Sequence, residues 1–164
     1  MTSGELQQIL NLLPVSEDLG TAGQPTAVQF RSIAAAGYEV VINLAMPDST
    51  NALPDEADLV RQEGMDYVHI PVVWESPTLQ DLDRFFEAMD HQRDHKVFVH
   101  CALNMRVSCF VFLYRVIRGG VPLAEAANTM RRIWRPNPVW SRFLEDALRH
   151  HGLGDQEIAA LKLT

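Results

Sequence analysis

The chain has 164 residues, a hydrophobic fraction of 47% and a formal net charge of −7 at pH 7. This length suits a single domain, residues 1–164, with a full apolar core. The negative charge argues against nucleic acid or an anionic membrane as a partner. Two cysteines make no disulfide framework, and neither a signal peptide nor a membrane-spanning run is visible, so we expect a cytoplasmic protein.

Hydrophobic periodicity and turn residues predict strands that alternate with helices. In chain order we expect a helix over residues 3–13, a short edge strand at 19–22, a helix at 25–36, a strand at 38–46, a helix at 55–63, a strand at 65–72, a helix at 78–94, a strand at 96–100, helices at 107–117, 122–134 and 138–150, and a short amphipathic tail from 155. Such alternation is typical of an α/β fold, here a three-layer sandwich with a mostly parallel sheet of four to five strands flanked by helices. Ligands of such sheets bind beyond the carboxyl ends of the strands.

The most informative stretch is Lys96–Gly120, which predicts a buried strand, a tight loop that opens on Cys101, and an apolar helix. The backbone N–H groups of residues 102–107 have no intrahelical acceptors, so they can converge on an anion. A helix N-terminus also favours the thiolate form of a nearby cysteine. Cys101 is therefore a candidate thiolate at an oxyanion site, and its alternative role is that of a small buried hydrophobe. Cys109, in the middle of the apolar helix, is expected to be only that.

This loop resembles the signature loop of cysteine-dependent protein phosphatases, the tyrosine and dual-specificity class, in which His-Cys is followed by five residues, Arg, and Ser or Thr. Here His100-Cys101 is followed by Arg106 after only four residues, while Ser108 keeps the usual spacing. Asn104 falls where the family usually has glycine, and asparagine tolerates the left-handed conformation. We call residues 101–106 the signature loop.

The wider sequence is similar to one bacterial branch of this superfamily. The resemblance rests on the segments GTAGQPT, GYEVVINL and YVHIPV together with HCALNMR. Members of that branch occur alone or fused to β-lactamase-fold hydrolase domains. The order of elements is similar to the dual-specificity-phosphatase fold over essentially the full length of the chain.

The resemblance implies that Cys101 attacks phosphorus and forms a cysteinyl-phosphate. Ser108 would hydrogen-bond the thiolate, and His100 would support the loop through backbone contacts. The residues implied to bind the substrate phosphate are Ala102, Leu103, Asn104, Met105 and Arg106. Structural alternatives are that Arg106 pairs with a carboxylate and that Ser108 caps the helix. We expect Arg106 to face the bound oxyanion despite its displacement, and Val107 to pack into the core.

The general acid is harder to place. The family has an aspartate on the loop before the helix at 78–94, but Trp74 holds the nearest position in this chain and Glu75 follows it. Glu75 is the expected acid. Asp81 is also within reach, but Thr78 and Asp81 have the spacing of a capping box.

The favoured function is a metal-independent phosphatase that acts on a phosphorylated substrate, either a protein or a small molecule. No cofactor is expected. No metal is expected either, because the histidines do not have a defensible metal-ligand spacing. The second function is that of a pseudophosphatase, which binds an oxyanion or a phosphorylated partner without turnover. A third is sulfur transfer with a persulfide on Cys101. The sequence does not fix the oligomeric state.

Overall fold

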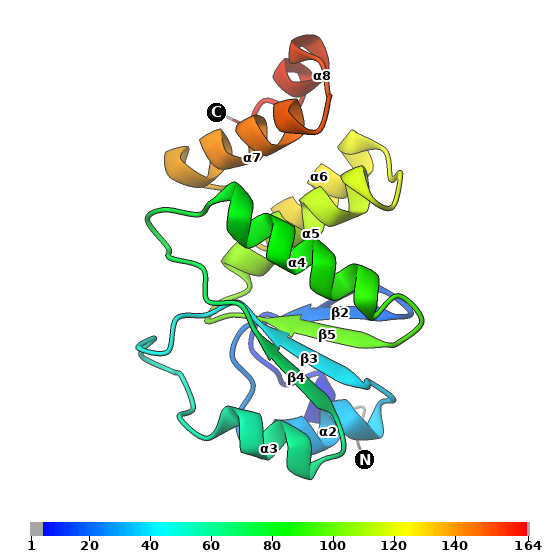
Figure 1. Ribbon diagram of the computed structural model, residues 1–164, viewed down its shortest axis with the longest axis vertical. Helices are drawn as coiled ribbons and strands as arrows, with labels where there is room; N and C mark the ends of the chain where they lie inside the picture. The colour runs from blue at the N-terminus through cyan, green and yellow to red at the C-terminus, as the bar shows by residue number, and fades with distance from the viewer. Residues whose placement is uncertain (1–4, 164) are drawn as a thin grey trace.

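A five-stranded sheet runs through the computed structural model, which describes residues 5–163 (Figure 1). The strands are β1 (Leu13–Ser16), β2 (Leu19–Ala22), β3 (Val40–Asn43), β4 (Asp66–His69) and β5 (Val97–His100). Their order across the sheet is β1-β2-β5-β3-β4. Only the β1–β2 pair is antiparallel, and the other neighbours are parallel. The predicted five-stranded, mostly parallel sheet is confirmed.

Helices cover both faces of this sheet. They are α2 (Gln29–Ala35), α3 (Glu56–Gln62), α4 (Leu79–His91), α5 (Met105–Ile117), α6 (Leu123–Arg131), α7 (Pro138–His150) and α8 (Asp155–Ala160). Figure 1 shows α2 and α3 on one face and α4 and α5 on the other, with α7 and α8 beyond α5. The three-layer arrangement predicted from the alternation of elements is therefore confirmed.

The central strands β3 and β5 are buried along their whole length, as expected of parallel strands covered on both faces. Alternate residues enter different clusters: Val97 and Val99 join the core under α4 and α5, whereas Phe98 joins the core under α2 and α3. This is the period-two alternation of a strand. Helix α5 is buried from Arg106 to Leu113, which agrees with its apolar sequence.

The N-terminal segment differs from the prediction. The helix expected at 3–13 is wrong for the described part, because residues 5 and 6 are followed by turns and β1 begins at Leu13. Asn11 has a φ of 51°, a left-handed conformation that ends a helix. Pro14 lies in the edge strand β1, where a missing N–H is tolerated. Residues 3 and 4 lie outside the described residues.

Strand β2 was expected at the edge of the sheet and instead lies between β1 and β5. All four of its residues are buried. The cause is the hairpin with β1, a strand that was not predicted from the sequence.

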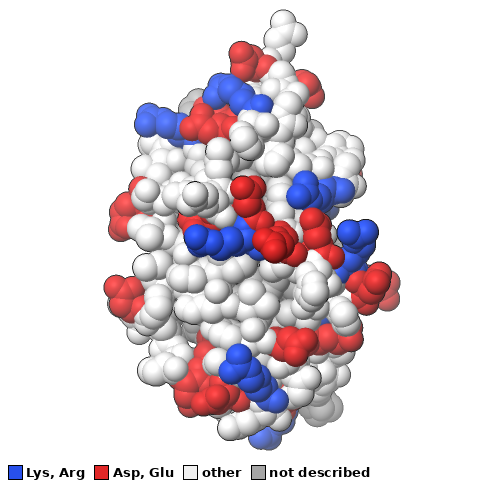
Figure 2. Space-filling model, viewed as in Figure 1, with Lys and Arg blue, Asp and Glu red and all other residues white. Residues whose placement is uncertain are grey.

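The charged residues are mixed over the face drawn in Figure 2, where Lys and Arg stand among Asp and Glu. No helix within residues 5–163 has the length and apolar character needed to cross a membrane.

Candidate active site

The signature loop lies at the carboxyl edge of the sheet, between the ends of three parallel strands. The N–H of Cys101 donates to the carbonyl oxygen of Ala22 at the end of β2 (3.3 Å), and the N–H of Leu44 after β3 donates to that of His100 (2.9 Å). The loops that follow β3 and β4 lie at the same end of the molecule (Figure 1). This is the edge at which parallel sheets bind ligands.

The carbonyl oxygens of the signature loop are held by donors from the surrounding chain. That of Cys101 faces Nδ1 of His100 (3.2 Å), and that of Leu103 accepts from Nδ2 of Asn11 (3.0 Å). The carbonyl oxygen of Ala102 accepts from the backbone N–H of Gln24 (3.1 Å) and from Nδ2 of Asn51 (3.2 Å). The loop therefore has its acceptors turned into the protein.

The N–H groups of the same loop are free. Within residues 5–163, the amides of residues 102–107 have no protein acceptor, and the first bonded amide is that of Ser108, which donates to the carbonyl of Asn104 (2.9 Å). Asn104 has a φ of 67°, which confirms the predicted left-handed residue. Its Nδ2 donates to Asn11 (2.9 Å) and to the hydroxyl of Thr21 (3.1 Å). Unpaired amides at a helix N-terminus form an anion-binding site.

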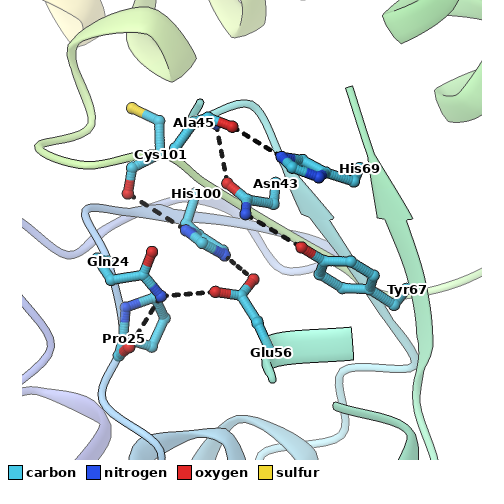
Figure 3. Close-up of polar contacts among 9 residues, drawn as sticks. All are labelled: Gln24, Pro25, Asn43, Ala45, Glu56, Tyr67, His69, His100 and Cys101. Carbon is cyan, nitrogen blue, oxygen red and sulfur yellow. Dashed lines mark hydrogen bonds and ion pairs between the residues drawn. The ribbon is translucent and has the colours of Figure 1, made fainter. Parts of the chain in front are cut away.

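The two cysteines are both buried and reduced. Cys101 has no exposed surface, and Figure 3 shows its sulfur pointing away from the ring of His100 and from Glu56. Burial raises the pKa of the Cys109 thiol far above its ordinary value, although Ser108 and Trp134 act in the opposite direction. Cys109 is therefore an unreactive core thiol, as its position in the helix predicted.

Arg106 turns into the protein and is only 8% exposed. Its Nε donates to the carbonyl oxygen of Val72 (2.8 Å), and its guanidinium carbon lies 5.4 Å from the centre of the Trp74 ring. Within residues 5–163, no carboxylate pairs with Arg106 and no protein acceptor meets its two terminal nitrogens. The fork of the guanidinium thus remains available to a ligand. Val107 is fully buried, which confirms the prediction that it packs into the core.

The hydroxyl of Ser108 is already engaged. It donates to the carbonyl oxygen of Met105 (2.8 Å) and accepts from Nε1 of Trp134 (3.0 Å). In this arrangement its proton does not point at Cys101, so support of a thiolate requires the hydroxyl to rotate away from Met105.

Three tryptophans form one cluster beside Arg106. The ring of Trp74 lies 5.4 Å from that of Trp134 and 5.7 Å from that of Trp140, measured between centroids. Nε1 of Trp140 donates to the backbone carbonyl of Trp74 (2.9 Å). These contacts connect the loop between β4 and α4 to the C-terminal part of the chain. They do so through Trp74, the residue nearest the position at which the family has its aspartate.

The two candidate acids have different surroundings. Asp81 is confirmed in a capping box: its N–H donates to the hydroxyl of Thr78 (3.0 Å), and its carboxylate accepts from the N–H of Thr78 (3.2 Å). Glu75 is exposed on a turn, and no contact within residues 5–163 joins its carboxylate to the signature loop. Neither carboxylate is held against Cys101.

Behind the loop lies a buried polar network that the sequence did not reveal (Figure 3). Nε2 of His100 is 2.6 Å from Oε2 of Glu56, and Nε2 of Gln24 donates to Oε1 of Glu56 (2.7 Å). The exposed fractions of His100, Glu56 and Gln24 are 0%, 3% and 7%. In the sequence, Glu56 passed for an ordinary acidic residue in the first turn of a helix.

Burial raises the pKa of Glu56, but hydrogen bonds from His100, Gln24 and Tyr67 and the charge of His100 outweigh it, so this pKa lies below its ordinary value. Burial and the charge of Glu56 raise the pKa of Tyr67 to about 12, against the effect of Asn43. At neutral pH the Glu56 carboxylate is therefore ionised, and the phenol of Tyr67 is neutral.

Sequence comparison places these features in a family. The family described as a DSP-PTPase phosphatase fused to NAD+ kinase matches residues 16–137. The chain belongs to this family. A β-lactamase hydrolase-like protein of Xylella fastidiosa (strain Temecula1) is 31% identical over 114 residues, which are 67% of this chain and 26% of that protein. The chain thus spans about a quarter of the length of the curated relatives it matches.

Solved structures agree with this assignment. A DUF442 protein from Shewanella putrefaciens CN-32 is 38% identical, with a TM-score of 0.82 over 92% of this chain and 99% of that one. The kinase associated phosphatase is 12% identical, with a TM-score of 0.74 over 90% of this chain and 99% of that one, and this likeness shows the fold alone. The predicted superfamily is confirmed.

Gly23 provides a test of how closely the signature loop is fitted. A Cβ at Gly23 would lie 2.7 Å from the carbonyl oxygen of Ala102 and 3.2 Å from Leu10. Gly23→Ala should displace the loop, and since overpacking costs about 1–3 kcal/mol, we expect vanadate to bind about 5- to 150-fold more weakly by calorimetry. Gly154→Ala is the control, because its Cβ would meet only Glu157 at 3.5 Å. Equal vanadate affinity in both variants would contradict a close fit at Gly23.

Proposed function

We propose that the protein is a cysteine-dependent phosphatase that hydrolyses a phosphomonoester through a cysteinyl-phosphate on Cys101. The observation that carries this proposal is the set of free amides at residues 102–107, with the unpaired guanidinium fork of Arg106 beside them. Together they supply donors and positive charge for the oxygens of a phosphoryl group. The family and the fold support the same chemistry.

In the first step the Cys101 thiolate attacks phosphorus, a sulfur–phosphorus bond forms, and the bond to the leaving oxygen breaks. The amides of Ala102, Leu103, Asn104 and Met105 and the fork of Arg106 bind the non-bridging oxygens. Glu75 protonates the leaving oxygen. In the second step water attacks phosphorus, the sulfur–phosphorus bond breaks, and phosphate and the thiolate are released. Ser108 stabilises that thiolate after its hydroxyl rotates, so that it donates to the sulfur instead of the carbonyl oxygen of Met105.

A second candidate function is that of a pseudophosphatase, which binds a phosphorylated partner without turnover. Two observations favour it: Glu75 has no contact that directs it to the loop, and the Ser108 hydroxyl is engaged by Met105 and Trp134. Anion binding by the loop would be the same in both functions, so only turnover distinguishes them.

The first test is to trap the intermediate. After brief exposure to an aryl phosphate and acid quenching, mass spectrometry should find one phosphoryl group on Cys101, because aryl leaving groups depart with little help from an acid. Cys101→Ser should carry no phosphoryl group on cysteine. Cys109→Ala should carry as much phosphoryl group on Cys101 as the unaltered protein does. An unlabelled protein that still binds vanadate would indicate the pseudophosphatase.

The second test concerns the displaced arginine. Arg106→Lys keeps the charge but loses the two-point contact, and hydrogen bonds to charged groups contribute about 1.5–3 kcal/mol, so vanadate should bind about 10- to 100-fold more weakly. Arg118→Lys is the control, since Arg118 is exposed and pairs with Asp90. Unchanged affinity in Arg106→Lys would remove Arg106 from the binding site.

The third test concerns the acid. If Glu75 protonates the leaving group, Glu75→Gln should slow alkyl phosphates by about 100-fold or more, should slow aryl phosphates far less, and should remove one limb of the pH–rate profile. Glu17→Gln, also on an exposed turn, is the matched control. A profile identical to that of the parent would show that the protein works without Glu75.

A further inference from the structure

The peptide group between Leu103 and Asn104 is held by a single donor. Nδ2 of Asn11 donates to the carbonyl oxygen of Leu103 (3.0 Å), and in the described part of the chain no other donor reaches that oxygen. The carbonyl oxygen of Ala102, by comparison, accepts from two donors, a backbone N–H and the side chain of Asn51. The orientation of the Leu103–Asn104 peptide group therefore depends on one side chain, that of Asn11.

The direction of this carbonyl group also sets the direction of an amide. A trans peptide group is planar, so its N–H points away from its carbonyl oxygen. No described residue has a cis peptide bond. Because the carbonyl oxygen of Leu103 is turned to Asn11, the N–H of Asn104 points to the opposite side, and it is one of the free amides of the signature loop. Asn11 thus fixes the direction of one candidate oxyanion donor.

The backbone on both sides of Asn11 is itself anchored. Ile9 is buried in the core that contains the apolar residues of α2. The carbonyl oxygen of Leu10 accepts from the N–H of Gly23 (2.7 Å), and Leu13 begins β1. Between these anchors Asn11 has a left-handed φ of 51°, a conformation that asparagine tolerates better than most residues. The amide of Asn11 is therefore presented to the signature loop from a fixed backbone.

A second hydrogen bond between the same two segments runs in the opposite direction. Nδ2 of Asn104 donates to the backbone carbonyl oxygen of Asn11 (2.9 Å). In both bonds the acceptor is a carbonyl oxygen, which can only accept, so the amide nitrogens of Asn11 and Asn104 must be the donors. The N-terminal segment and the signature loop are therefore joined at two points.

We propose that Asn11 is a positioning residue for the oxyanion site: by holding the carbonyl oxygen of Leu103, it directs the amide of Asn104 at an oxygen of the bound phosphoryl group. A donor that is oriented beforehand costs no reorganisation when the anion binds. The N-terminal segment before β1 is then a part of the site, although it lies about ninety residues away in the chain. The inference rests on the proposed function only in that the signature loop binds a phosphoryl group or its analogue.

Asn11→Gly removes the donor and keeps the backbone conformation. Glycine adopts the left-handed conformation without steric cost, and Asn11 is exposed, so the variant should fold like the unaltered protein. We expect vanadate to bind about 2- to 12-fold more weakly by calorimetry, the range that corresponds to one hydrogen bond. Lys162→Gly is the matched control, because Lys162 is also exposed and also has a left-handed φ (53°). Equal vanadate affinity in Asn11→Gly and the unaltered protein would overturn the proposal.

Amide NMR distinguishes positioning from a general loss of stability. Saturating vanadate should shift the N–H resonances of both Ala102 and Asn104 in the unaltered protein. In Asn11→Gly the shift at Asn104 should become smaller, whereas the shift at Ala102 should persist, because the carbonyl oxygen of its peptide group faces Nδ1 of His100. Equal changes at both amides, or no shift in the unaltered protein, would overturn the proposal. If the expected pattern is found and no phosphocysteine forms, the proposed function fails while the role of Asn11 stands.

Discussion

The structure of the site depends on one constraint, the direction in which the peptide groups of the signature loop point. Anion binding needs the amides of residues 102–107 to be free, and this requires the carbonyl oxygens of the same loop to be held elsewhere. His100, Gln24, Asn51 and Asn11 supply those donors from four different segments. The left-handed Asn104 then turns the chain into α5 without a glycine. Gly23 leaves the room that this arrangement needs.

The same constraint accounts for the arginine that comes one residue early. With Val107 buried in the core, the start of α5 is fixed, and Arg106 reaches the carbonyl of Val72 and the face of Trp74 instead of solvent. Trp74 is in turn held by Trp134 and Trp140. An arginine is long enough, and its fork broad enough, for its terminal nitrogens to stay free under these contacts.

The site also separates binding from proton transfer. Donors for an oxyanion are built into the backbone and cost no reorganisation when a ligand arrives. The carboxylates near the loop are either engaged in a helix cap, as Asp81 is, or exposed, as Glu75 is. The buried carboxylate of Glu56 lies behind the loop and contacts Nε2 of His100 instead. The donors that we propose for a phosphoryl group are thus in place, whereas neither Asp81 nor Glu75 is held against Cys101.

The sequence by itself determined the fold class, most elements and the loop around Cys101, because these follow from local periodicity and capping. The left-handed Asn104 and the buried Val107 were expected from the resemblance of that loop to the phosphatase signature loop. It failed at the N-terminus, where the spacing of Leu6, Ile9, Leu10 and Leu13 matched a helix, whereas the residues after Leu6 form turns and Leu13 pairs with β2 as the first residue of β1. It also missed Gln24, Asn51 and Glu56. These residues lie far from Cys101 in the chain, and only tertiary packing brings their donors and charge to the loop. In the sequence, a glutamate on the surface cannot be told from a glutamate that is buried against a histidine, because the residues that surround it in space are not known.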